Sequence, residues 1–301
     1  MAYLYPLIAV LIWAGNTIVS KHAAGVIFPA EIGFYRWLLA GLLFTPFLLR
    51  PVLANWMAVR PQLWRLAVLG VLGMATYQSL AYYAAHLTTA TNMGMILALM
   101  PMMALGLSIA MLGQQLTLGT LVGAMVSLAG VLLVVTEGQP ARLLTHGIGW
   151  GDAMMLVANF AYALYSVLLK RWKIDLPATQ MLYVQILVAI IALLPLYLAS
   201  PKAGIHLNNL PHIGFAGVLA SMVAALAWMH GVARLGPSRT ALFFNLLPVF
   251  TALAAALVLD EQLHGSVLIG GVLIVGGVLA SGRWQKAVWT PSNATMKRAS
   301  T

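Results

Sequence analysis

Several long apolar stretches carry polar and aromatic side chains at helical spacing, a pattern that could bind an amphipathic small molecule. In the stretch 3–20, Trp13, Asn16, Thr17 and Ser20 follow the i, i+3, i+4, i+7 pattern of one helix face. Comparable faces recur along the chain, and Ser166 belongs to one of them. The candidate binding residues are Trp13, Asn16, Ser79, Tyr82, Tyr83, His86, Asn92, Asn159, Tyr162, Trp228 and Asn245.

Aromatic rings beside a few amide and hydroxyl groups suit a ligand with an apolar body and a polar head. An amide can donate to a carboxylate and accept from an ammonium group, so Asn16 and Asn245 could hold the two charges of a zwitterion. Tyr82, Tyr162 and Trp228 would then contact its side chain. The alternative is that these groups only hydrogen-bond one helix to another.

Arg36 is the basic residue that lies within an apolar span, in the stretch 30–49. It could capture a carboxylate, extend to the membrane surface, or pair with Glu31. Pro101 and Pro248 interrupt two other apolar stretches, and each removes a backbone hydrogen bond. A kink is expected at each proline, and the pair could act as hinges.

The composition predicts an all-α integral membrane protein. Of the 301 residues, 62% are hydrophobic and 7% are charged, too few to cover the surface of a soluble protein. Many apolar runs reach the ~20 residues that cross a ~30 Å hydrocarbon core. Polar, proline and glycine breaks delimit ten candidate transmembrane helices, at 3–20, 30–49, 64–85, 91–112, 117–135, 149–169, 177–198, 211–232, 239–259 and 265–282.

The net charge of +10 reports orientation in the membrane and does not indicate nucleic-acid binding, because the basic residues lie between apolar spans. With the N-terminus inside, the inner segments carry twelve Lys and Arg residues, and the outer segments carry Lys21, Arg142 and Lys202. Both termini are therefore expected in the cytoplasm. Trp64 and Trp172 lie near span ends and are expected to anchor the membrane interface.

The chain contains an internal duplication with a constant offset of 147 residues. At this offset Pro101 corresponds to Pro248, Gln115 to Gln262, Gly123 to Gly270, and Gly130 to Gly277. Five helices per copy is an odd number, so the second copy is expected to lie inverted relative to the first. The expected units are residues 1–136, residues 147–282 and a cytoplasmic tail, 283–301. The glycines should let 117–135 and 265–282 approach neighbouring helices, within a monomer or across a homodimer.

The segment LIWAGNTIVSKHAAGVIFPAEIGFYRWLLAG, and the repeated pattern of a proline, then GQQL or DEQL, then a glycine-rich helix, resemble the EamA-type drug/metabolite transporter superfamily. The resemblance covers residues 5–282. Within the superfamily, the chain resembles bacterial amino-acid exporters of the inner membrane, including aromatic amino-acid exporters. The resemblance implies ten helices in two inverted repeats, with a central cavity lined chiefly by the first, third, fourth, sixth, eighth and ninth. The inverted repeat and the paired prolines favour alternating access over a constant pore. Multidrug or nucleotide-sugar transport within the same superfamily is the alternative.

Other functional classes find little support in the sequence. No HExxH motif, phosphate-binding glycine loop or acid–histidine cluster is present, so neither an enzyme nor a metal or cofactor site is expected. The absence of cysteine excludes disulfides and thiolate metal sites. The acidic residues all fall at or near loops, which favours uniport or exchange over proton antiport. The expected partners are a small-molecule substrate and the lipid bilayer.

Overall fold

The computed structural model describes residues 2–23, 26–88, 90–139, 141, 149–259, 265–283 and 287–289, and 84% of these described residues are helical. The α-helices are α1 (Leu4–Ala23), α2 (Pro29–Ala54), α3 (Trp56–Val59), α4 (Leu63–Gly70), α5 (Tyr77–Ala84), α6 (Ala90–Leu97), α7 (Met100–Leu112), α8 (Leu118–Val135), α9 (Trp150–Arg171), α10 (Ala178–Ala199), α11 (Leu210–Gly214), α12 (Ala224–Leu235), α13 (Pro237–Ala241), α14 (Leu247–Leu259) and α15 (Gly265–Arg283).

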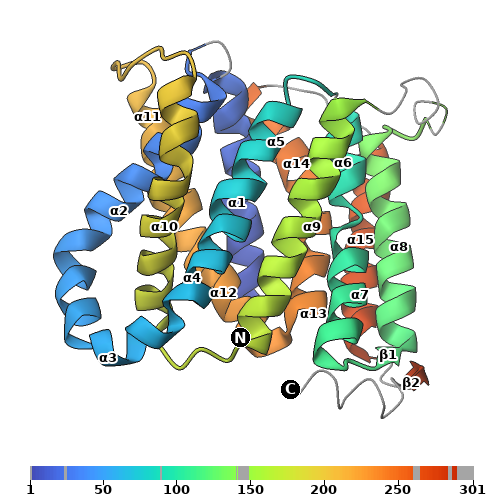
Figure 1. The fold of residues 1–301 in the computed structure, drawn as a ribbon. Coiled ribbons are helices and arrows are strands. Elements are labelled where there is room, and N and C mark those ends of the chain that lie inside the picture. Colours follow the sequence, from blue (N-terminus) through green and yellow to red (C-terminus); the bar gives the residue numbers. More distant parts are fainter. Residues whose placement is uncertain are drawn as a thin grey trace.

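The helices form a bundle in which segments far apart in sequence lie side by side (Figure 1). Within the described residues, six helices are long and apolar enough to cross a membrane: Pro29–Ala54, Asn92–Leu112, Leu118–Val135, Trp150–Arg171, Ala178–Ala199 and Leu210–Leu235. Leu4–Val19 and Gly265–Ser281 are shorter apolar helices. The expected spans 64–85 and 239–259 are absent from this set of eight.

Four of the expected spans are interrupted. In two of them a π-helical stretch, η2 (Val71–Thr76) or η4 (Phe215–Val223), joins two α-helices. In the other two, expected to be continuous helices with a kink, the helix stops before the proline. Pro101 and Pro248 lie in the first turns of α7 and α14, after a non-helical Ala98–Leu99 pair and after the 3₁₀ stretch η5 (Leu242–Leu246). Proline favours a first turn because that turn does not need its missing N–H.

Several elements begin at the offset seen in the sequence. Helices α7 and α14 begin at Met100 and Leu247, which are 147 residues apart, and α8 and α15 begin at Leu118 and Gly265, again 147 apart. The stretch η2, moved by 147, becomes 218–223 and falls inside η4. The interruptions therefore occur at equivalent places in the two parts of the chain.

Helices α8 and α15 pack closely along two pairs of glycines. A Cβ atom added at Gly123 would lie 2.5 Å from the carbonyl oxygen of Gly277, and one at Gly130 would lie 2.6 Å from that of Gly270. A Cβ atom added at Gly277 would likewise lie 2.5 Å from the carbonyl oxygen of Gly123, and one at Gly270 would lie 2.6 Å from that of Gly130. The two backbones can approach so closely only because these positions lack side chains. The glycines expected to allow close packing thus serve a contact within the chain.

Two short strands depart from the expected all-α fold. Strand β1 (Leu116–Thr117) pairs antiparallel with β2 (Ala287–Trp289), with Leu116 opposite Trp289 and Thr117 opposite Ala287. Part of the expected tail, 283–301, thus pairs with the turn that precedes α8. The two-residue strand β1 carries no alternating apolar pattern that could have predicted it. The rest of the tail (284–286 and 290–301), Gln262 and the side chain of Ser20 lie outside the described residues.

The two ends of the bundle differ in which loops they carry. Figure 1 shows α3, β1 and β2 at the lower end and α11 at the upper end. At the upper end the Glu31 carboxylate accepts backbone hydrogen bonds from Phe28 (3.3 Å), Ala203 (2.7 Å) and Gly204 (2.9 Å). This buried carboxylate therefore joins the start of α2 to the loop before α11.

Candidate functional site

An aromatic cluster at the centre of the bundle brings together three of the predicted site residues. The Trp13 ring centroid lies 5.4 Å from that of Trp228 and 6.1 Å from that of Tyr162, and Tyr162 and Trp228 are 5.7 Å apart. The rings come from α1, α9 and α12. Phe244 of η5 completes the contact, at 5.3 Å from Trp13 and 4.7 Å from Trp228. These distances are those of rings in direct contact.

The polar atoms of this cluster are fixed by hydrogen bonds to neighbouring helices. The Trp13 Nε1 donates to the carbonyl of Ala220 in η4 (3.1 Å), and the Trp228 Nε1 donates to the Ser166 hydroxyl of α9 (3.1 Å). Asn16, one helical turn after Trp13, has a buried Oδ1 with no hydrogen-bond partner among the described residues. A buried acceptor without a partner is uncommon in folded proteins and indicates a place for a ligand or water donor.

Arg36 of α2 is 2% exposed and makes hydrogen bonds to neutral groups. Its Nε donates to the Ser221 hydroxyl (2.7 Å), and its Nη1 donates to the Tyr82 hydroxyl (3.1 Å). The expected pairing with Glu31 does not occur, since that carboxylate binds backbone N–H groups. Nor does the side chain extend to the surface. Within the described part of the chain, no ion pair neutralises this guanidinium.

The π-helical stretch η4 connects Arg36 to the aromatic cluster. Its neighbouring residues Ala220 and Ser221 accept from Trp13 and from Arg36, respectively. The Ser221 hydroxyl also donates to the Ala216 carbonyl, five residues earlier, as the π-helical spacing allows (2.8 Å). The Arg36 contact and the aromatic cluster thus meet at neighbouring residues of η4.

The other predicted residues of the third helix and of the fourth lie elsewhere or make separate contacts. The Tyr83 hydroxyl pairs with the Ser200 hydroxyl (3.2 Å), and His86 is exposed in the turn after α5. Ser79 is partly buried, without a described contact to the cluster. The Asn92 amide donates to Asp152 at the start of α9 (3.3 Å), where Thr88 also binds.

Asn159 and Asn245 make their hydrogen bonds at the interrupted helices. The Asn159 amide donates to the carbonyl of Ile96, just before the break between α6 and α7. The Asn245 amide lies within η5 and donates to Ser127 of α8 (2.8 Å). Each amide keeps a buried Oδ1 that has no partner in the described structure. These two hydrogen bonds stabilise the interrupted helices, and neither amide N–H is directed toward Arg36 or the aromatic cluster.

Among the described residues, the carboxylates lie at or near loops, as the sequence predicts. Glu31 and Asp152 are the two that are buried, and both lie in the first turn of a helix. Asp152 accepts from the Gly149 N–H (2.9 Å), as Glu31 does from Phe28. A carboxylate in this position satisfies free N–H groups and interacts favourably with the helix dipole. No group of three or more His, Asp or Glu that could hold a metal is found among the described residues.

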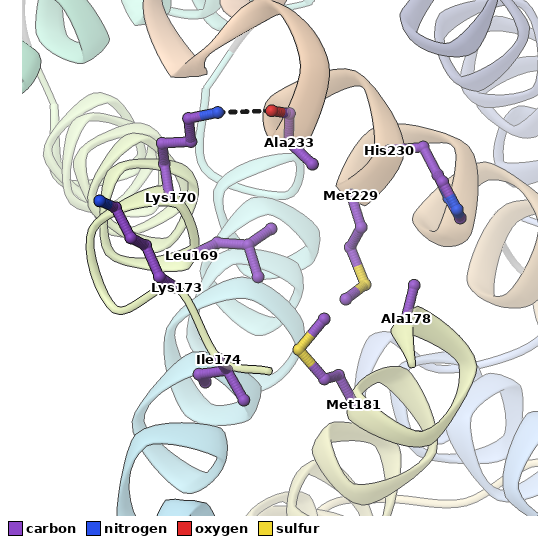
Figure 2. A pocket seen from close by; sticks show the side chains of 9 residues that line it. All are labelled: Leu169, Lys170, Lys173, Ile174, Ala178, Met181, Met229, His230 and Ala233. Carbon is purple, nitrogen blue, oxygen red and sulfur yellow. Dashed lines mark hydrogen bonds between the residues drawn. The ribbon is translucent and has the colours of Figure 1, made fainter. Parts of the chain in front are cut away.

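Two cavities occur near chain turns, and neither is lined by a predicted site residue. One of about 340 Å³ lies between the end of α9, the start of α10 and the end of α12 (Figure 2). The other, of about 320 Å³, is polar and lies between the turn before α8 and the turn before α13. At Trp13, Tyr162 and Trp228 the aromatic rings instead contact one another.

Sequence reasoning missed four residues of the site. Tyr77 and Tyr165 contact Tyr162 at 4.8 Å and 5.3 Å, and Phe244 and Ser221 complete the cluster and the Arg36 contact. Tyr165 could have been found, because it follows Tyr162 by three residues on the same helix face. Phe244 offered no signal, since an apolar side chain in an apolar span is unremarkable.

Several known proteins similar to this chain are named as transporters or exporters. It is 28% identical to the uncharacterized transporter YyaM of Bacillus subtilis over 278 residues, covering 90% of each chain. It is 24% identical over 220 residues to a probable terminal-alkyne amino-acid exporter of Streptantibioticus cattleyicolor, covering 72% of each. A solved crystal structure has the same fold, with a TM-score of 0.75 at 20% identity, covering 93% of this chain and 96% of the other.

The family assignment rests on matches to both parts of the chain. The model of the EamA-like transporter family matches residues 1–136 and again residues 149–283. These two matches cover nearly all of the bundle, including Arg36 and the aromatic cluster. The chain therefore belongs to the EamA-like transporter family and is a membrane transporter of small molecules, not an enzyme.

Proposed function

We propose that this transporter exports neutral amino acids with apolar or aromatic side chains, by alternating access. The observation that carries the proposal is Arg36, a buried cation whose described hydrogen-bond partners, Ser221 and Tyr82, are neutral. A lone charge in a low-dielectric interior is costly unless it is paired. A substrate carboxylate would supply the missing negative charge.

The remaining parts of a zwitterion also find matching groups. The unpartnered Oδ1 of Asn16 can accept from an ammonium group, and Trp13, Tyr162 and Trp228 offer an apolar and aromatic surface. The relative named as a terminal-alkyne amino-acid exporter supports this substrate class. Because the rings are in contact, a substrate must separate them to bind, which couples binding to movement of α1, α9 and α12.

The proposed architecture has ten membrane-spanning helices in two inverted repeats, residues 1–136 and 147–282, followed by the cytoplasmic tail 283–301. The elements that begin 147 residues apart support it, as do the two family matches. The twelve-to-three distribution of Lys and Arg supports an inner-membrane orientation with both termini in the cytoplasm. The glycines of α8 and α15 are used within the chain, which favours a monomer over a glycine-mediated homodimer.

Alternating access is assigned to the helices broken before Pro101 and Pro248. Discontinuous helices at equivalent places in two repeats are typical of transporters. Each break leaves backbone groups that can change partners as the chain bends, and Asn159 already binds the Ile96 carbonyl beside one of them. The buried carboxylates Glu31 and Asp152 are both engaged at helix starts, which supports uniport or exchange without proton coupling.

Transport of a drug or a nucleotide sugar is the competing function. A nucleotide sugar carries a diphosphate, which proteins usually bind with several positive charges. Arg36 is the one fully buried cation among the described side chains, so the site favours a single carboxylate.

The test is uptake by purified protein in liposomes, offered separately labelled phenylalanine, methionine, threonine, a nucleotide sugar and a lipophilic cationic drug. The proposal expects saturable uptake of phenylalanine and methionine, weaker uptake of threonine, and none of the last two. Saturable uptake of the nucleotide sugar or the drug, without any of the amino acids, would assign the competing function.

A further inference from the structure

The cavity of about 340 Å³ between α9, α10 and α12 has an apolar floor and a basic side. Leu169, Ile174, Met181 and Met229 provide the apolar surface, and Lys170 and Lys173 provide the charge. Figure 2 shows Met181 and Met229 pointing toward each other across the cavity, with both lysines on the α9 side. No acidic residue lines it, and Asp175, two residues after Lys173, is exposed outside the lining. A ligand suited to this cavity has an anionic head and an apolar tail.

The lysines retain free donors for such a head group. The Lys170 ammonium donates to the carbonyl of Ala233 near the end of α12, which uses one of its three donors. Lys173 is exposed and has a left-handed backbone (φ 44°), where the chain leaves α9 and turns toward α10. His230, also in the lining, is held by the Leu226 carbonyl and stacks on Tyr5 at 5.3 Å.

The depth of the cavity points to the membrane interface. Trp172 lies between the two lysines in sequence and packs edge-on against Trp64 at 5.1 Å, and Trp64 is 57% exposed. Tryptophan in such positions is typical of the headgroup level of a bilayer. Helix α10, which begins at the cavity, presents Ile191 and Leu198 outward at 71% and 62% exposure. The cavity therefore lies at the headgroup level, and Ile191 and Leu198 lie 10 and 17 residues beyond Met181, where the acyl chains of a lipid bound at the lysines would extend.

We infer that this cavity binds one anionic phospholipid, with its phosphate at Lys170 and Lys173 and the start of an acyl chain against Met181 and Met229. Basic pockets between transmembrane helices are recognised binding places for anionic lipid head groups. A cavity of 340 Å³ falls in the range of small-molecule sites, about 300–1,000 Å³. A lipid there would join the ends of α9 and α12 to the start of α10, and so act on helices that carry the central site.

The experiment measures lipid binding to the purified full-length protein by native mass spectrometry. Phosphatidylglycerol is compared with phosphatidylcholine of the same acyl chains and with soluble glycerol phosphate. The variant K170Q/K173Q is compared with R50Q/R60Q, which removes two exposed charges elsewhere in the chain. Each lysine near an anionic group contributes roughly fivefold in affinity, so K170Q/K173Q should weaken phosphatidylglycerol binding about 25-fold. R50Q/R60Q should change it less than about twofold.

A second pair of variants tests the acyl chain. Met181→Trp fills the cavity and keeps both lysines, and Leu198→Trp adds the same ring on the exposed face of α10. The inference expects Met181→Trp alone to weaken phosphatidylglycerol binding. It is overturned if K170Q/K173Q and R50Q/R60Q weaken binding equally, which indicates diffuse surface attraction. It is also overturned if Met181→Trp and Leu198→Trp bind phosphatidylglycerol with equal affinity. The same holds if glycerol phosphate binds the wild type as tightly as phosphatidylglycerol does.

Discussion

Replacing Arg36 with glutamine separates substrate recognition from folding. The guanidinium is 2% exposed, and its described partners Ser221 and Tyr82 carry no charge. Losing one partner of a buried charge pair costs about 2–5 kcal/mol. At ~1.4 kcal/mol per decade, Arg36→Gln should weaken phenylalanine binding at least ~30-fold. Phenylalaninamide lacks the carboxylate, so the variant should bind it within ~3-fold of the wild type.

The same substitution makes an opposite prediction for stability. Without substrate the Arg36 charge has no ion-pair partner in the described structure, and an isolated buried charge destabilises the fold. The substrate-free variant should therefore unfold at an equal or higher temperature than the wild type. The exposed Arg60→Gln is the matched control, and it should leave both phenylalanine affinity and stability unchanged.

Isothermal titration of the purified proteins measures both ligands, and a thermal unfolding scan measures stability. The reasoning is refuted if Arg36→Gln binds phenylalanine like the wild type. It is also refuted if Arg36→Gln weakens the binding of phenylalanine and of phenylalaninamide equally, because the guanidinium would then not recognise the carboxylate.

Three further predictions follow from the helix contacts and the ends of the bundle. Gly130→Ala should destabilise the protein by about 1–3 kcal/mol in a denaturation assay, because its Cβ would lie 2.6 Å from the Gly270 carbonyl oxygen. Gly106→Ala, where nothing lies within 4 Å, should not destabilise it. Pro101→Ala should slow liposome uptake more than it weakens substrate binding, since α6 and α7 could then join; unchanged uptake would count against a hinge. In intact cells an impermeant thiol reagent should label Leu207→Cys but not Ala58→Cys, and the reverse pattern would overturn the orientation.

Large parts of this structure follow from the sequence by simple physics. Apolar length and the breaks between apolar runs located helices such as α2, α8, α9 and α10 within a few residues. Glycine spacing predicted close helix packing, and the partner was found only in the structure, because α8 and α15 are far apart in the chain. Helical periodicity selected Trp13 and Tyr162 as candidates, and in the structure their rings lie 6.1 Å apart.

The interruptions could not be read from the chain. A π-helical stretch carries an extra residue in its turn, so a uniform period of 3.6 residues misplaces every side chain beyond it. Tyr77, the first residue of α5, was missed because it lies off the face that carries Ser79 and Tyr82. His86, on that predicted face, is exposed because α5 ends at Ala84. The sequence marks neither η2 nor η4 with a distinctive residue.

The partners of single polar atoms were equally beyond the sequence. Arg36 was correctly seen as unusual, yet its contacts to Ser221 and Tyr82 depend on packing across α2, α5 and η4. Asn245 looked equivalent to Asn16 as an amide in an apolar span. In the structure it donates to Ser127, while the Asn16 Oδ1 keeps no described partner. Composition predicts that such residues need partners, and only the fold decides which.

The central claim, transport of a zwitterionic amino acid recognised by its carboxylate and side chain, is tested most directly by counterflow. Liposomes containing the purified protein are loaded with unlabelled phenylalanine and diluted into a trace of labelled phenylalanine. The account predicts a transient accumulation of label that excess outside phenylalanine abolishes, that the same concentration of phenylalaninamide inhibits far less, and that Arg36→Gln greatly reduces. Absence of accumulation with the wild type, or equal inhibition by phenylalanine and its amide, would contradict the account.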